Sequence, residues 1–161
     1  MKTVKKILMS LILLAGVMTP QSALAFGKGE KSLGVMGGYA TYNNGGYAGI
    51  GFQWEFANHF RLSPDLGYVF QNRYKSGFVV NADMQFPFKI VRGFGVYPLA
   101  GITVNNWHYT NSGNATRVGF NFGAGFDVYF TSNLKLTIQG KYSLLKDTDG
   151  GFFGAGLSYI F

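Results

Sequence analysis

Apolar and polar side chains alternate along most of this chain, and this period of two constrains its fold more than any other feature. From Arg117 to Val128 every even position is apolar, and every odd position is polar, charged or glycine. Successive side chains of a β-strand point to opposite faces, whereas an α-helix repeats every 3.6 residues. The segment therefore predicts a strand with one oily face and one polar face.

The same alternation recurs along the chain and gives eight predicted strands. Their approximate ranges are 32–42, 48–56, 60–70, 78–86, 94–104, 117–128, 134–144 and 153–161. Short breaks such as 57–59 predict antiparallel hairpins, and residues 106–116 form a longer polar connection. Pro64 and Pro98 fall inside two strands, and we expect a bulge or local distortion at each because proline donates no ladder hydrogen bond.

The first 25 residues have the order of a secretory signal peptide. Three lysines within the first six residues precede a short apolar stretch, Ile7 to Val17, and then the small residues Ala23 and Ala25. This pattern predicts cleavage after Ala25 and leaves residues 26–161 as one mature domain. The chain has no cysteine, so neither a lipid anchor on cysteine nor a disulfide is available.

Charge is confined to one face of the predicted strands. The polar face carries four acids and four bases, and the apolar face carries none, which predicts an interior network because buried charges need partners. The eight residues are Glu55, Arg61, Asp65, Asp83, Arg117, Asp127, Lys135 and Lys141. The remaining basic residues are scattered along the chain, so we expect no nucleic-acid partner.

An oily face turned outward needs hydrocarbon around it. Hydrocarbon offers no hydrogen bonds to the backbone, so a spanning sheet must close on itself, and strands of about 9–11 residues are long enough to cross. Aromatic residues near strand ends fit the girdles that mark the two interfaces. The sequence therefore predicts an all-β fold, an eight-stranded antiparallel up-and-down transmembrane barrel with both termini on the periplasmic side.

The whole mature chain resembles the small eight-stranded outer-membrane barrels, the OmpX-like and OmpA-transmembrane-like group. The closing stretch Gly156-Leu157-Ser158-Tyr159-Ile160-Phe161 resembles the signal read by the outer-membrane assembly machinery, with Gly156, Tyr159 and Phe161 as its marks. Residues 96–102 resemble a strand of a broad outer-membrane barrel family. The resemblance implies a cell outer membrane location, contact with lipid and lipopolysaccharide, and recognition by that machinery.

Function is less constrained than fold. The favoured hypothesis is a structural or surface-interaction protein with a side-chain-filled lumen, whose extracellular loops, including Trp107, His108 and Tyr109, contact a ligand. A narrow channel for ions or small solutes is the main alternative, since many inward positions are glycine. A lipid A-modifying enzyme is the third, but His108 lacks a nearby acid, so we predict no enzyme, no catalytic residue, no metal and no cofactor.

Overall fold

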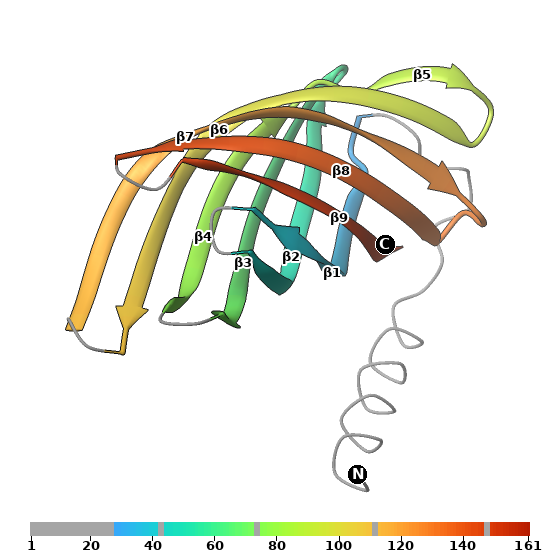
Figure 1. Ribbon diagram of the computed structural model, residues 1–161. Helices are drawn as coiled ribbons and strands as arrows, with labels where there is room; N and C mark the ends of the chain where they lie inside the picture. Colours follow the sequence, from blue (N-terminus) through green and yellow to red (C-terminus); the bar gives the residue numbers. More distant parts are fainter. Residues whose placement is uncertain (1–27, 42–43, 73–74, 111–112, 147–148) are drawn as a thin grey trace, which may run out of the picture.

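The computed structural model describes residues 28–41, 44–72, 75–110, 113–146 and 149–161, which form a closed antiparallel barrel (Figure 1). Its strands are β1 (Lys31–Ala40), β2 (Gly45–Ala57), β3 (Phe60–Asn72), β4 (Lys75–Gln85), β5 (Phe88–Val91), β6 (Phe94–Tyr109), β7 (Gly113–Tyr129), β8 (Leu134–Leu145) and β9 (Gly150–Ile160). Chain neighbours pair, β1 pairs with β9, and β4 pairs with β6. Each of the eight long strands thus has two partners, and the predicted eight-stranded barrel is confirmed. None of the described residues forms a helix long and apolar enough to cross a membrane.

The ninth strand, β5, is short and continues the line of β4 past Phe86-Pro87. The pairing of β6 keeps one register across this break, from Gln85↔Leu99 to Phe88↔Val96. Register shifts lie near strand ends, at 55/57, 69/72 and 89/91, and none lies at Pro64 or Pro98. No bulge therefore lies at either proline. The expected local distortion is found at Pro64, where the β2–β3 ladder lacks the pairs between Gly51↔Asp65 and Trp54↔Leu62, but not at Pro98, where the β6–β7 ladder continues through Pro98↔Ala124.

All connections between the strands are short. The segments outside the strands are 41–44, 58–59, 73–74, 86–87, 92–93, 110–112, 130–133 and 146–149. The predicted long polar connection over 106–116 is wrong, because β6 runs to Tyr109 and pairs with β7 up to Tyr109↔Gly113. Polar residues such as Asn106 and His108 are the outward face of a strand that continues, and their polarity alone resembled a loop.

The two ends of the barrel differ. Ser32, near the start of β1, pairs with Ile160, the last residue of β9. The start of the described chain and its C-terminus therefore lie at the same end of the barrel, which we call the end of the termini. At the opposite end the β3–β4 and β6–β7 hairpins reach beyond their neighbours (Figure 1). Pairing between β7 and β8 starts only at Gly119↔Leu145, which leaves residues 113–118 of β7 past the end of β8.

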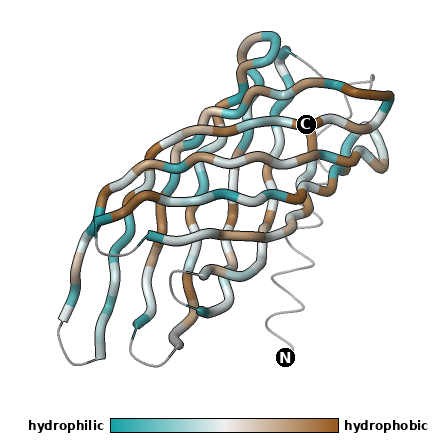
Figure 2. The backbone as a smooth tube through the Cα atoms, turned by 45° about the horizontal axis from the view of Figure 1, so that its top comes forward, coloured by the Kyte–Doolittle hydropathy of each residue, from teal (hydrophilic) through white to brown (hydrophobic). Residues whose placement is uncertain are grey.

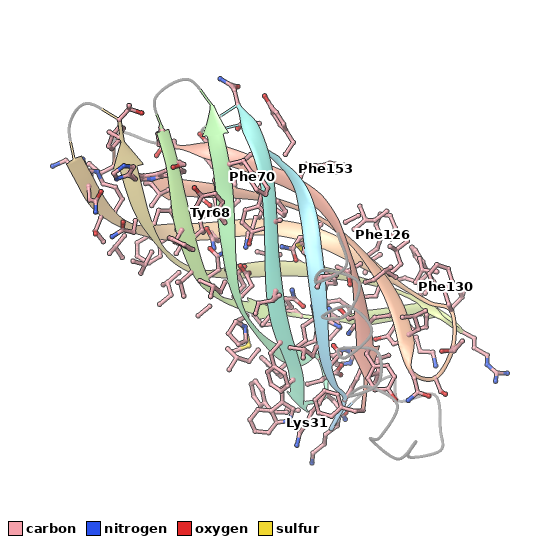
Figure 3. All side chains as sticks on the ribbon, turned by 90° about the horizontal axis from the view of Figure 1, so that it is seen from below. Lys31, Tyr68, Phe70, Phe126, Phe130 and Phe153 are labelled. Carbon is pink, nitrogen blue, oxygen red and sulfur yellow. The ribbon has the colours of Figure 1, made fainter. Side chains whose placement is uncertain are left out.

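The apolar face looks outward, as predicted. Phe120 and Phe122 are 66% and 51% exposed, whereas Asn121 between them is 2% exposed. Hydrophobic segments alternate with paler or hydrophilic ones along much of the tube (Figure 2). Side chains such as Tyr68, Phe126 and Phe153 project from the outer surface (Figure 3). Oily side chains around a polar interior are the reverse of a water-soluble barrel.

Aromatic rings gather in two zones on this outer surface. Near the termini, Trp54, Phe56 and Phe60 follow one another at ring-centroid separations of 5.9 and 6.4 Å, and Phe86 lies 5.7 Å from Phe60. Toward the opposite end, Tyr68 contacts Phe70 and Phe78 at 5.6 and 5.0 Å. Aromatic residues at both edges of an apolar band are typical of membrane barrels.

Candidate functional site: the barrel interior and its open ends

A buried ion pair spans the interior in the half of the barrel nearer the termini. Arg61 on β3 and Asp127 on β7 lie 2.8 Å apart, with side chains only 1% and 3% exposed. The Arg61 Nε donates to Gln85 at 2.6 Å, and the Thr137 hydroxyl donates to Asp127 at 2.6 Å. The Arg61 guanidinium also lies 4.8 Å from the Tyr97 ring centroid. These contacts connect β3, β4, β6, β7 and β8 across the interior.

A second pair involves a residue outside the predicted strands. Lys135 Nζ contacts Glu30 at 2.6 Å, and the Tyr129 hydroxyl donates to the same carboxylate at 2.9 and 3.0 Å. Glu30 precedes β1 and is fixed there because the Glu55 amide donates to its carbonyl at 2.9 Å. Glu30 lies two residues before the inward-facing Ser32, and residues two apart in an extended chain share a face. This spacing could have identified Glu30 as an interior residue from the sequence.

Farther along the barrel, one lysine bridges two carboxylates. Lys141 lies 2.9 Å from Asp83 and 3.3 Å from Asp65. Asn121 donates to Asp83 at 2.8 Å, and Asn81 donates to Asp65 at 2.6 Å. Four strands, β3, β4, β7 and β8, therefore meet through one hydrogen-bonded cluster in the middle of the interior.

The other two residues of the predicted charge network behave differently. Glu55 is 5% exposed and faces the interior opposite Arg61 in the β2–β3 ladder, but it makes no ion pair with a described cation within 4.0 Å. The sequence predicted that Arg117 belongs to the interior charge network, but Arg117, unlike Asp127, forms no ion pair with a described carboxylate. It lies ten residues away along β7, roughly 33 Å at ~3.3 Å per residue, and its Nη1 donates to the Thr116 carbonyl at 3.4 Å.

Large apolar side chains occupy the interior toward the end opposite the termini. They come from β1, β2, β3, β4, β6 and β9, and each is at most 6% exposed; we call this set the apolar plug, and it comprises Ala40, Tyr47, Val69, Val79, Trp107 and Phe152. The rings of Tyr47 and Phe152 pack edge-on at 4.6 Å. The plug and the ionic clusters thus lie in successive parts of the barrel interior.

Inward glycines make room for these side chains. A methyl group added at Gly67 would collide with the Tyr47 ring, and one at Gly125 or Gly154 would meet Tyr97 or Phe152. The glycines therefore match bulky neighbours on adjacent strands, as expected for a small barrel whose interior is filled by side chains.

The residues assigned to an extracellular loop lie in β6 instead. Trp107 is fully buried in the plug, Tyr109 is half-buried, and His108 faces outward with its Nδ1 2.6 Å from the Asn114 side-chain oxygen. The loop assignment is thus wrong, because Trp107 is the inward residue of a continuing strand. Within the described ranges no three His, Asp or Glu side chains are placed to share a metal ion.

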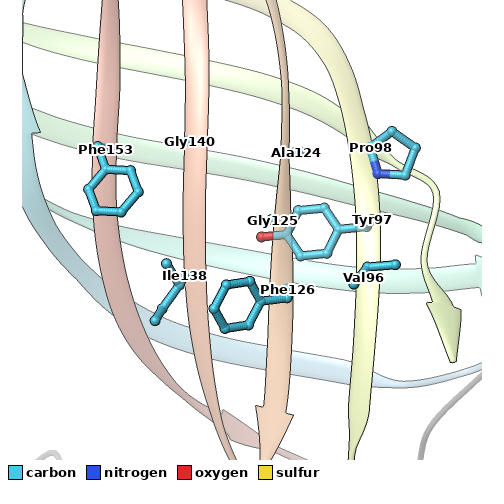
Figure 4. A pocket seen from close by; sticks show the side chains of 9 residues that line it. All are labelled: Val96, Tyr97, Pro98, Ala124, Gly125, Phe126, Ile138, Gly140 and Phe153. Carbon is cyan, nitrogen blue, oxygen red and sulfur yellow. The ribbon is translucent and has the colours of Figure 1, made fainter. Parts of the chain in front are cut away.

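A hollow of the outer surface lies over β6 to β9 (Figure 4), and another lies over β1, β8 and β9. Ala124 and Gly140 lie at the floor of the first hollow between larger side chains that include Phe126, Ile138 and Phe153. Its lining is apolar and faces the same surroundings as the rest of the outer face. It offers no group for acid–base or nucleophilic chemistry.

The predicted assembly and cleavage residues are placed as follows. Gly156 is buried in β9, Tyr159 is half-buried in the same strand, and Phe161 is 41% exposed, with its amide donating to the Lys31 carbonyl at 3.0 Å. Ala23 and Ala25 lie outside the described residues. Recognition by the assembly machinery and cleavage of a signal peptide stay predictions.

Comparison with solved structures identifies the fold. The N-terminal β-barrel domain of Pseudomonas aeruginosa OprF matches with a TM-score of 0.74 at 20% identity, over 84% of this chain and 100% of that one. This is the fold of the small outer-membrane barrels. Neisserial surface protein A matches at 0.65 and 16% identity, over 82% of this chain and 95% of that one. Yersinia pestis Ail, in complex with the heparin analogue sucrose octasulfate, matches at 0.64 and 17% identity, over 83% and 99%. No protein-family model and no curated protein sequence matches the chain.

Proposed function

We propose that this chain is an integral outer-membrane protein whose barrel is closed to solutes and which acts as a structural element and as a contact surface. The observation that carries this proposal is the outward apolar face around a filled polar interior, exemplified by Phe120 at 66% and Asn121 at 2% exposure. Such a surface is stable in hydrocarbon and unfavourable in water. Lipid and lipopolysaccharide are the surroundings that fit it.

Closure of the lumen is supported at two levels. The pair Arg61–Asp127 and the cluster around Lys141 fill the polar part, and the apolar plug fills the part beyond. A conducting path needs continuous water, and a plug of rings such as Trp107 and Phe152 opposes it. We therefore favour the closed barrel over the narrow channel.

Export and orientation complete the proposal. A signal peptide over residues 1–25 delivers the chain to the periplasm, and the stretch ending at Phe161 directs it to the assembly machinery. The termini then stay periplasmic, and the β3–β4 and β6–β7 hairpins face outward. Since the connections are short, contact with a partner falls to the ends of these hairpins. The heparin-analogue complex of the similarly folded Ail supports such a role for a barrel of this size.

A catalytic role is not proposed. His108 has Asn114 as its side-chain partner, and His59 contacts the Pro87 carbonyl at 2.7 Å and stacks on Phe88. Neither histidine contacts a described carboxylate that would orient it as a general base, nor a described nucleophile.

Planar-bilayer conductance tests the closed barrel. We expect no steady current steps from the refolded mature chain, and steady ion-selective steps would show that the lumen conducts.

Membrane insertion needs a separate test. The protein should be recovered with outer-membrane fractions, and the unheated folded form should migrate differently from the heated form in detergent gels. Recovery as a compact soluble monomer in plain buffer would contradict the proposal.

A further inference from the structure

The exposed charged side chains at the end of the termini are all basic. Lys28 and Lys31 lie before and at the start of β1, Lys89 lies in β5, and Arg92 lies in the turn that follows β5. We call these four residues the basic rim. Five of the seven acidic residues are turned into the interior, namely Glu30, Glu55, Asp65, Asp83 and Asp127. The other two fall between β8 and β9, which are joined at the opposite end. Among the described residues, no acidic side chain is therefore exposed beside the basic rim.

The short strand β5 extends the apolar outer face at this end (Figure 1). Its side chains Phe88, Ile90 and Val91 are 46%, 58% and 59% exposed. Phe88 pairs with Val96, and Val91 pairs with Phe94, and both partners belong to the outward face of β6. Directly paired residues of a ladder share a face. The apolar outer face therefore continues past the last pair of β3 and β4 onto β5.

The turn that carries Arg92 is held against the barrel. Gly93 has a φ of +81°, in the left-handed region that favours glycine. Its carbonyl accepts a hydrogen bond from the Tyr129 amide at 2.8 Å. Arg92 therefore has a fixed backbone position beside the apolar side chains of β5. Its side chain is exposed and forms no ion pair with a described carboxylate.

Cations and aromatic rings lie together at this end of the outer surface. Lys31 Nζ lies 5.9 Å from the ring centroid of Trp54, and Figure 3 shows Lys31 beside aromatic side chains. The His59 ring stacks on Phe88 at 5.0 Å, which joins β5 to the turn between β2 and β3. Rings with basic side chains nearby are typical of the interface between hydrocarbon and phospholipid headgroups.

We propose that the basic rim binds anionic phospholipids of the leaflet that surrounds the end of the termini. Arg92 and Lys31 contact the phosphate-bearing headgroups, and Phe88 and Val91 lie among the upper parts of the acyl chains. A surface with basic groups and no exposed acid attracts an anionic leaflet. The neighbouring apolar side chains favour a lipid over a soluble polyanion, because a soluble polyanion offers them no hydrocarbon.

The inference rests on the proposed insertion into the outer membrane and adds the class of lipid that the barrel selects in one leaflet. Its failure is distinguishable from a failure of insertion. Gel migration of unheated and heated protein reports a folded, inserted barrel, whereas lipid preference is measured afterwards on protein that has passed this test.

A fluorescent label on β5 tests the proposal. The chain has no cysteine, so Val91→Cys in the mature chain gives a single attachment site for an environment-sensitive fluorophore. In phosphatidylcholine vesicles, brominated acyl chains should quench the label, because it lies in lipid. Brominated phosphatidylglycerol should occupy this position roughly fivefold better than brominated phosphatidylcholine, the factor expected for one basic residue at an anionic surface.

Substitutions in the labelled chain assign this preference to the rim. Arg92→Gln should bring the preference for phosphatidylglycerol close to one, and Arg92→Lys should keep most of it because the charge remains. Lys146→Gln removes an exposed cation at the opposite end and is the matched control, so it should leave the preference unchanged. Gel migration checks that each variant is folded.

Several results would overturn the proposal. Quenching by aqueous iodide, with none by brominated lipid, would place β5 in water. Emission that changes with the protein-to-lipid ratio would mean that a second copy of the chain covers β5. Equal quenching by the two brominated lipids, or an equal loss of preference in Arg92→Gln and Lys146→Gln, would show that the rim does not select the lipid.

Discussion

The two halves of the barrel interior are built by the same strands and are filled in opposite ways. Near the termini, side chains such as Arg61 and Asp127 meet across the lumen as buried, hydrogen-bonded ions. Toward the other end, Trp107 and Phe152 belong to an apolar plug. The polar half is specific, because each ion depends on a partner from another strand. The apolar half depends mainly on volume, because dispersion contacts have little directionality.

The largest expected effect comes from breaking an ion pair in the polar half. Arg61→Leu leaves Asp127 buried without its partner, and we expect it to lower the free energy of unfolding by about 3–5 kcal/mol. Urea unfolding in lipid vesicles, followed by gel migration, measures the loss. The variant Arg61→Leu/Asp127→Leu should recover most of it, because a hydrophobic pair no longer contains a buried lone charge. If both variants lose the same stability, packing around Arg61 matters more than charge.

The next largest effect is expected from a charge on the outward face, for comparison with the substitutions in the interior. Phe122→Arg puts a charge on the outward face near the middle of β7 and should lower the free energy of unfolding by about 2–4 kcal/mol in a bilayer. Phe122→Leu, which keeps an apolar side chain, is the control and should change little. The same urea titration applies, and equal tolerance of Arg and Leu at this position would mean that the wall does not face lipid.

Shrinking the plug should have a comparable or somewhat smaller effect. Trp107→Leu removes part of a fully buried ring and should lower the free energy of unfolding by about 2–3 kcal/mol through lost contacts and a residual cavity. Unlike Arg61→Leu, it needs no matched second substitution, because no buried charge is left behind. Rescue by a second apolar substitution that adds volume, Ala40→Val, would support the volume-based view. Loss beyond that of Arg61→Leu would contradict it.

The smallest effect concerns the glycines that admit bulky neighbours. A methyl group at Gly67 meets the Tyr47 ring, whose hydroxyl donates to Asp65 at 3.0 Å, so Gly67→Ala should lower the free energy of unfolding by about 1–3 kcal/mol. Gly140→Ala is the matched control. Its added methyl would lie 3.6 Å from the Phe153 ring, an ordinary contact on the outer face, and it should be neutral or slightly stabilising in the same titration.

Much of the fold could be predicted because successive side chains of a β-strand point to opposite faces, so the local sequence shows which face is apolar. The alternation over residues 117–128 fixed both the strand and the side of it that meets hydrocarbon, and β7 extends that prediction at both ends. The boundaries were less predictable. Asn106, His108 and Thr116 are polar yet lie in strands, because beyond the apolar band an outward side chain no longer needs to be oily.

The sequence by itself determined the type of barrel, the inside and outside of its wall, and most of the charges that are buried. Only the tertiary structure decided which charges meet. Arg61 and Asp127 are 66 residues apart and lie on strands that do not pair, and Lys135 finds Glu30 from outside the strands. Partners across a lumen depend on strand tilt and stagger around the whole barrel, a property of closure that no local pattern encodes.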